Sequence, residues 1–184
     1  LLNDNVNVGA FAFNNTGTGV LQIDNPVTIA GNYNQGSSAT LQIGVASGAT
    51  TSGTSSDSGY GRLNVTGAAT VARGSSIRLV GTGAGYGFAA GQRYLVIQGG
   101  AGSSYGGVTA QGGVSTLNYS IANNTASVAG NAVTDGAGLD LVLTVNSAYT
   151  SSAGAATAPN AMAAFGGLGR SAGLDPQLMN LQNA

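Results

Sequence analysis

Apolar and polar residues alternate over short stretches along most of the chain, and glycine-rich turns separate these stretches. The densest example is residues 60–80, where three alternating runs follow one another with turns at Gly67 and at residues 74–76. A strand of four or five residues buries only one stripe of side chains, so it needs similar strands on both sides to complete its hydrogen bonds. The pattern therefore predicts that residues 60–80 form one coil of a β-solenoid.

Similar alternating runs precede this coil. The sequence VLQI around Leu21 returns as TLQI around Leu41, and Leu63 follows at a similar distance. A spacing of roughly twenty residues is about one turn of a repeat architecture with short strands. We expect Leu21, Leu41 and Leu63 to stack in register, with strands on both sides of Pro26 and a corner at residues 31–36.

The pattern changes after residue 80. Residues 45–60 before it predict a polar loop, whereas residues 94–97 and 139–145 predict strongly apolar strands, and residues 114–128 predict a hairpin around Asn123 and Asn124. The open end of a solenoid exposes unpaired strand edges, so a terminal hairpin or small sandwich that covers it has a physical purpose. Tyrosine and phenylalanine gather here, as expected of a bulky plug over the last coil.

These patterns predict an all-β fold, a parallel β-helix that ends in a β-hairpin or sandwich-like cap and a short C-terminal helical tail. We assign residues 1–83 to the terminal coils, 84–148 to the cap and 149–184 to a linker and short helix, in which Asp175 and Pro176 suit a helix start. A β-sandwich is the alternative, because short alternating strands with glycine turns describe it as well.

Composition supports the solenoid. Charged residues make up 6% of the 184 residues, against about 25% in typical proteins, and all of them are Arg or Asp. A surface of Asn, Thr, Ser and Gly suits stacked coils, and the 42% hydrophobic content argues against a disordered Gly/Ser-rich chain. The net charge of −1 and the scattered arginines make nucleic acid an implausible partner. Since the pattern at Leu1 is already strand-like, we expect this chain to be a piece of a longer protein.

Few residues could carry catalysis. Histidine, cysteine and lysine are absent, which excludes the usual catalytic triads, thiolate metal sites and phosphate-loop lysines within this chain; we expect no catalytic residue, metal, nucleotide or other cofactor. Asp135 and Asp140 lie close together in DGAGLD, so a carboxylate pair for polysaccharide cleavage or a calcium site is conceivable there. We expect instead that both lie at turns around the last strand.

The order of these segments resembles a known family. LQIDNPVTIAGNYNQ, ATLQIGV, YGRLNVTGAATV, GQRYLVIQGG, LNYSIANNTASV and GLDLVLTV together resemble the C-terminal passenger region of pertactin-like bacterial type V autotransporters. The resemblance implies a right-handed β-helix that ends in a cap called the autochaperone. It also implies display at the surface of a Gram-negative bacterium, or secretion, after export through the periplasm and outer membrane. The membrane β-barrel of that family, towards which the tail would lead, is not represented, and the resemblance implies no catalytic residue.

The expected function is therefore structural and non-enzymatic. The segment would cap the β-helix and nucleate its folding during translocation, with its own upstream coils and its own β-barrel as partners. The alternative is an adhesin or self-association module that binds host glycan, matrix or a like chain on a neighbouring cell.

Overall fold

The computed structural model describes residues 1–83, 86–106, 117–123 and 126–146, and every regular element in these ranges is a β-strand. The all-β class is confirmed for this part of the chain. The predicted tail at 149–184 lies outside the described residues. The strands are β1 (Val6–Asn15), β2 (Val20–Ile23), β3 (Pro26–Gln35), β4 (Thr40–Val45), β5 (Arg62–Val65), β6 (Ala69–Val71), β7 (Ser76–Gly81), β8 (Arg93–Gly99), β9 (Ser104–Tyr105), β10 (Asn118–Ile121), β11 (Val128–Asp135) and β12 (Gly138–Val145).

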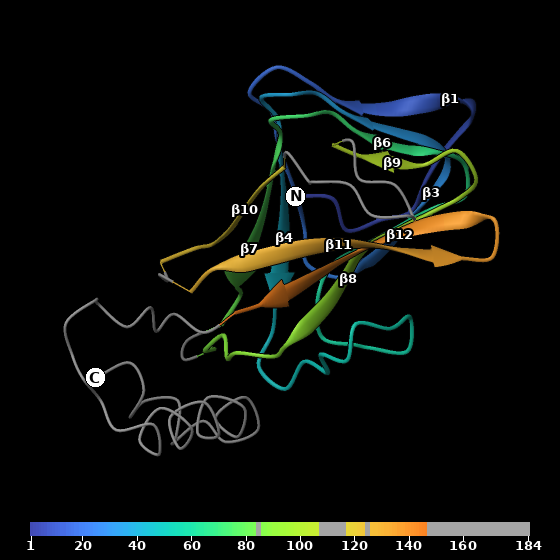
Figure 1. Cartoon of the computed structure of the whole chain (residues 1–184). Helices are drawn as coiled ribbons and strands as arrows, with labels where there is room; N and C mark the ends of the chain where they lie inside the picture. The colour runs from blue at the N-terminus through green and yellow to red at the C-terminus, as the bar shows by residue number, and fades with distance from the viewer. Residues whose placement is uncertain (84–85, 107–116, 124–125, 147–184) are drawn as a thin grey trace, which may run out of the picture.

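The strands form two sheets (Figure 1). The four-stranded sheet has the order β10-β7-β4-β2, and all of its pairs are parallel. The eight-stranded sheet has the order β11-β12-β8-β5-β3-β6-β9, with β1 also paired to β3. This sheet is mixed. β12 pairs antiparallel with both β11 and β8, whereas all other strand pairs of the sheet are parallel.

The predicted register is confirmed for one step and wrong for the next. Leu21 pairs with Leu41, as the repeated LQI sequence indicates. Leu63, however, pairs with Val27 in the other sheet, and Leu41 is followed in its own sheet by Ile77. The reason is the long loop between β4 and β5, because it moves the next strand that pairs with β4 further along the chain, to β7. Sequence spacing alone therefore misassigned Leu63.

Two further local predictions differ from the structure. Residues 31–36 do not separate two strands, because β3 runs through residues 31–35; the chain turns its corner at Gly31 within β3, and the second half of β3 pairs with both β1 and β6. The described parts of the hairpin predicted at residues 114–128 do not pair with each other, because β10 pairs parallel with β7 and Val128 belongs to β11, which pairs with β12. The hairpin instead consists of β11 and β12, which turn at Gly136 and Ala137. Gly136 has φ +58°, and glycine suits the positive φ of a two-residue hairpin turn.

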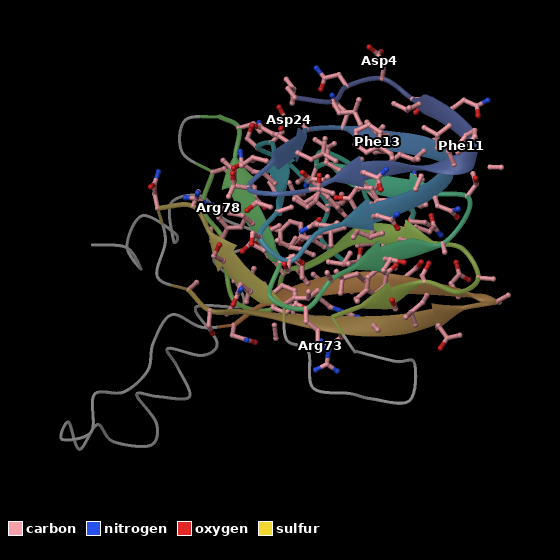
Figure 2. All side chains as sticks on the ribbon, turned by 90° about the horizontal axis from the view of Figure 1, so that it is seen from above. Asp4, Phe11, Phe13, Asp24, Arg73 and Arg78 are labelled. Atoms are coloured by element: carbon pink, nitrogen blue, oxygen red, sulfur yellow. The ribbon has the colours of Figure 1, made fainter. Side chains whose placement is uncertain are left out.

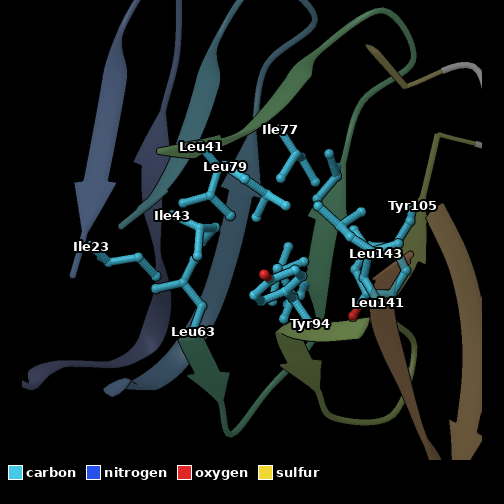
Figure 3. Close-up of a cluster of buried hydrophobic side chains, with 14 of the residues drawn as sticks. Ile23, Leu41, Ile43, Leu63, Ile77, Leu79, Tyr94, Tyr105, Leu141 and Leu143 are labelled. Atoms are coloured by element: carbon cyan, nitrogen blue, oxygen red, sulfur yellow. The ribbon is translucent and has the colours of Figure 1, made fainter. Parts of the chain in front are cut away.

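The core lies where the inward side chains of the two sheets meet (Figure 3). Ile23, Ile43 and Leu79 are stacked partners in successive strands of the four-stranded sheet, and all three are fully buried. Burying such a side chain stabilises a fold by roughly 1.5–3 kcal/mol relative to its exposure. The short strands are therefore held mainly by the apolar columns that run across them.

Glycines occupy one corner of the stack in successive layers. The N–H of Gly67 donates to the carbonyl of Gly31 over 2.8 Å, and the N–H of Gly100 donates to the carbonyl of Gly67 over 2.8 Å. A Cβ atom on Gly67 would lie 2.8 Å from the Gly31 oxygen, and one on Gly100 would lie 2.7 Å from the Gly67 oxygen. Glycine is needed at this corner because adjacent backbones approach too closely for a side chain.

Buried amides join the two sheets at the other end of these strands. Asn15 and Gln35 are register partners, and each donates from its side chain to a backbone carbonyl of the four-stranded sheet. The acceptors are Thr40 at 3.0 Å and Ser76 at 2.9 Å. The hydroxyl of Tyr33 donates to Gln35 Oε1 over 2.8 Å. These hydrogen bonds satisfy polar groups that would otherwise be buried without a partner.

No helix among the described residues is long and apolar enough to cross a membrane.

Candidate functional site

One end of the stack presents uncovered strand edges. β1 pairs only with β3, and β2 pairs only with β4, so the outer edge of each has no strand partner among the described residues. Leu2 N–H, just before β1, donates a hydrogen bond to the Gln22 carbonyl at the edge of β2. β1 and β2 contain no charged residue and no proline. They therefore lack two of the devices by which edge strands avoid pairing with other chains.

Exposed apolar side chains gather at the same end. Phe11 on β1 is 80% exposed and Val20 on β2 is 61% exposed, while Leu1 just before β1 is 72% exposed. Figure 2 shows Phe11 at the outer margin of the molecule. Of the large apolar residues recorded as exposed in the described ranges, only Val133 lies elsewhere, on β11. The β1/β2 end is therefore an apolar edge suited to pairing with a further layer of strands; we call it the open edge.

At the other end, the β11–β12 hairpin extends the eight-stranded sheet beyond β8, while β9 pairs only with β6 and β10 only with β7 among the described strands. β12 lies beside β8, and its residues Leu141 and Leu143 are fully buried in the core. β11 is the outermost strand, with a largely exposed surface. An antiparallel hairpin thus follows the parallel strands, and its outer strand ends at the charged Asp135, whereas β1 and β2 contain no charged residue.

Aromatic residues support this end of the core. Tyr86, Phe88 and Tyr94 form successive ring contacts, and Tyr94 also contacts Tyr60 edge-to-face with ring centroids 5.3 Å apart. Tyr94 is fully buried, and burial raises its pKa far above the ordinary value for tyrosine. The grouping predicted for the cap is thus present in part, and it includes Tyr60 from the loop before β5, which the sequence analysis did not assign to it.

The structure brings Asp135 and Asp140 onto one face of the hairpin. Asp135 ends β11 next to the turn, as predicted, whereas Asp140 lies within β12, opposite Val133 and Gln98, so its assignment to a turn is wrong. The side-chain amide of Gln98 donates to Asp135 Oδ2 over 3.2 Å. Asp140 is 8% exposed, and its Oδ1 atom is buried without a hydrogen-bond partner.

The environment of Asp140 disfavours its charge. Burial and the nearby Asp135 charge raise the pKa of Asp140 to about 6, while the Gly99 backbone N–H and the Arg62 charge act in the opposite direction. A carboxylic acid whose pKa is raised, next to an ionised carboxylate, can act as a general acid in catalysis. Such a role requires contact with substrate, and the Oδ1 atom of Asp140 is buried. Among the described residues, no group of three or more acidic side chains is placed to hold a metal ion.

Asp57 is a structural residue that the sequence analysis missed. It is buried in the loop between β4 and β5, where it accepts hydrogen bonds from Ser52 Oγ at 2.6 Å and from the N–H groups of Gly53 at 2.7 Å and Thr54 at 3.0 Å. Burial alone would raise the pKa of Asp57, but these hydrogen bonds outweigh it and the pKa is lowered. The sequence offered one sign of an ordered loop: Asp57 is the only charged residue in this polar segment and follows Ser52 by five residues.

This loop covers the outer face of the eight-stranded sheet. A Cβ atom on Gly53 would lie 3.1 Å from the Val142 side chain and 2.9 Å from that of Arg93, and Val142 is 3% exposed. Arg62 donates to Asn64 Oδ1 over 3.0 Å and to the Thr54 carbonyl over 3.4 Å. The predicted loop is confirmed, but it is a packed part of the fold.

No protein family, curated protein or solved structure matches this chain.

Proposed function

We propose that this chain is a structural, secretion-assisting segment of an autotransporter passenger, with no enzymatic role. Its strands are the last coils of a right-handed parallel β-helix, and the β11–β12 hairpin is part of the cap that nucleates folding of the helix. The pairing supports the β-helix over a β-sandwich, since sandwich sheets are antiparallel and most pairs here are parallel.

The contrast between the two ends carries this proposal. At the open edge β1 and β2 contain no charged residue and expose Phe11 and Val20, whereas the hairpin bounds the eight-stranded sheet beyond β8. Coils of a solenoid are stabilised by interfaces with their neighbours, so the first stable unit determines where folding starts. A chain whose hairpin end folds first outside the outer membrane offers the open edge to coils that emerge later. The folding of these coils outside the membrane would oppose backward sliding of the chain and would need no ATP.

The partners in this proposal are the upstream coils of the same protein and its β-barrel, and the location is the surface of a Gram-negative bacterium or its surroundings. The test joins the chain between upstream passenger coils and an autotransporter β-barrel and compares surface display with and without residues 84–148. We expect the deletion to abolish protease-resistant display of the upstream coils. Unchanged display would overturn the folding role. Leu141→Asn within the intact chain should lower display as well, whereas Val133→Thr on the exposed face of β11 serves as the matched control.

Unfolding of the isolated chain gives a second test. If residues from about 60 to 148 nucleate folding, denaturant should produce two transitions and leave a protease-resistant C-terminal piece. A single transition without a resistant piece would indicate a uniform stem.

The second candidate is an adhesin. It is favoured by a polar groove on the outer face of the four-stranded sheet, which reaches the open edge only at Val20. Binding or cell aggregation by the isolated chain distinguishes this function from the folding role, because a folding segment needs no external ligand.

A further inference from the structure

The groove lies across all four strands of the smaller sheet. It has a volume of about 300 Å³, the lower end of the range for small-molecule sites. Thr40, Gln42, Ser76, Arg78 and Ser120 provide its polar lining, and Val20 and Ile121 border it. Since alternate residues of a strand point to opposite faces, these polar side chains share the outer face while their neighbours fill the core.

The polar groups form an ordered row. Gln22, Gln42, Arg78 and Ser120 are successive register partners across β2, β4, β7 and β10. The amide of Gln42 donates to Gln22 Oε1 over 2.9 Å, and the amide of Gln22 donates to Asp24 Oδ1 over 2.9 Å. These bonds orient the Gln42 side chain and leave its Oε1 atom as an acceptor. Hydrogen-bonding groups are therefore set out at the strand spacing of about 4.8 Å.

Arg78 is the charged member of this row. It is exposed at the margin of the molecule (Figure 2). Within the described part of the chain its guanidinium has no hydrogen bond or ion pair, whereas that of Arg62 is hydrogen-bonded. The groove lining contains no acidic residue, and Asp24, at the β2 end of the same face, is bonded to Gln22. An unpaired guanidinium is suited to bidentate binding of a carboxylate.

We propose that this groove binds an acidic glycan, an oligosaccharide that carries a sugar carboxylate. Arg78 binds the carboxylate, and the side chains of Thr40, Ser76, Ser120 and Gln42 bind ring hydroxyls. Hydroxyl side chains suit a polyol because each can both donate and accept. Val20, which is 61% exposed, contacts the apolar edges of the sugar rings. This inference rests on the adhesin function and is independent of the folding role.

The charge of the groove argues against other ligands. A nucleic acid presents a charge at every phosphate and is bound by several cations, whereas the groove contains one. An added peptide strand would need an uncovered strand edge, and the groove lies on a sheet face. A single arginine among hydroxyl and amide groups fits a ligand with many hydroxyls and few charges.

The test is calorimetric titration of the chain with a galacturonic acid tetramer and with a neutral galactose tetramer. We expect the acidic tetramer to bind, the neutral one to bind at least about tenfold more weakly, and Arg78→Gln to weaken acidic binding by a similar factor, since a charge-assisted hydrogen bond contributes about 1.5–3 kcal/mol. Arg73→Gln is the matched control, because Arg73 is also exposed but does not line the groove. A sulfated galactose tetramer distinguishes sugar carboxylates from sulfates.

Three outcomes overturn the proposal. One is equal binding of the acidic and neutral tetramers, another is an equal loss in Arg73→Gln, and the third is no detectable binding of the acidic tetramer at millimolar concentration. Preferential binding of the sulfated tetramer would overturn the carboxylate assignment. Arg78→Gln should leave surface display unchanged, so failure of the glycan site and failure of the folding role are distinguishable.

Discussion

Asp57 illustrates how one charge can order a loop composed mostly of Ser, Thr and Gly. Its carboxylate accepts from Ser52, Gly53 and Thr54, and the Tyr60 hydroxyl donates to it over 3.3 Å. The loop lacks the regular hydrogen bonds between paired strands, and the hydrogen bonds accepted by this carboxylate take their place. The loop is thereby held over Val142 on the sheet.

Replacing this charge should loosen the loop. We expect Asp57→Ala to lower the free energy of unfolding by about 1–3 kcal/mol, because buried N–H and hydroxyl donors lose their acceptor. Proteolytic cleavage within residues 50–58 should also become faster. Urea unfolding and timed proteolysis measure both effects. Asp4→Ala, at an exposed position, is the control and should change neither; a loop as resistant in Asp57→Ala as in the parent would contradict the role of Asp57.

Asp57 also predicts a dependence on acid. Because its pKa in the folded protein is below that of the unfolded chain, its contribution to stability is complete above about pH 4 and is lost as the pH falls through the folded pKa. The difference in unfolding free energy between the parent chain and Asp57→Ala should therefore be constant from pH 5 to 7 and shrink below pH 4. A difference that is the same at pH 3 and pH 7 would show that the carboxylate charge is irrelevant.

Asp140 should act in the opposite direction. Its pKa is about 6 in the folded protein and about 3.9 in an unfolded chain, so the folded state binds more protons between these values. The free energy of unfolding should therefore fall as the pH rises from 4 to 6. Asp140→Asn removes this fall and should stabilise the protein at pH 7 by roughly 1–3 kcal/mol. Urea unfolding at pH 4, 5, 6 and 7 tests this, with Asp4→Asn as control; destabilisation at pH 7 would show that the ionised carboxylate has a favourable partner.

Among the elements, the parallel strands depend on the glycine corner as much as on their own sequences. Gly67→Ala would place a Cβ atom 2.3 Å from Asn32 Oδ1 and 2.8 Å from the Gly31 carbonyl. The layers would have to separate, so we expect a loss of about 1–3 kcal/mol in the free energy of unfolding. Gly83→Ala, whose Cβ atom would have no neighbour within 4 Å, is the matched control. Denaturant midpoints should separate the two variants clearly.

The elements were more predictable than their partners. β5, β6 and β7 follow the alternation at residues 60–80 because each inward side chain enters the core. Pairing depends on loop length as well, and the loop around Asp57 moved Leu63 away from Leu41. The hairpin was misplaced because Asn123, with φ +56°, has the turn conformation expected of it, yet β10 gains more partners beside β7. Asp140 was misplaced because short sequence distance from a turn does not reveal burial by a neighbouring strand.

For the whole molecule, the asymmetry of its two ends is the property from which the proposed function follows. The groove lies on the outer face of the four-stranded sheet and reaches β2 only at Val20, so a bound glycan would leave the strand edges of β1 and β2 available for coil stacking. The two ends differ in the direction of their strands and in the exposed side chains beside the strand edges. Exposed apolar side chains at unpaired strand edges favour association, so the difference can be tested by measuring association of the isolated chain.

We expect the isolated chain to associate through the open edge. Phe11 and Val20 present apolar area beside strand edges that have no charge, which favours pairing with a second copy. Sedimentation velocity over a hundredfold range of concentration should reveal reversible dimers, and Phe11→Lys with Val20→Lys should weaken the dimer at least about tenfold, since each lysine adds repulsion and removes apolar area. Val133→Lys alters an exposed apolar residue on the hairpin and should have no effect. Equal weakening by Val133→Lys would place association at the hairpin end, and a monomer at every concentration would show that exposed edges and apolar area are insufficient for pairing between copies.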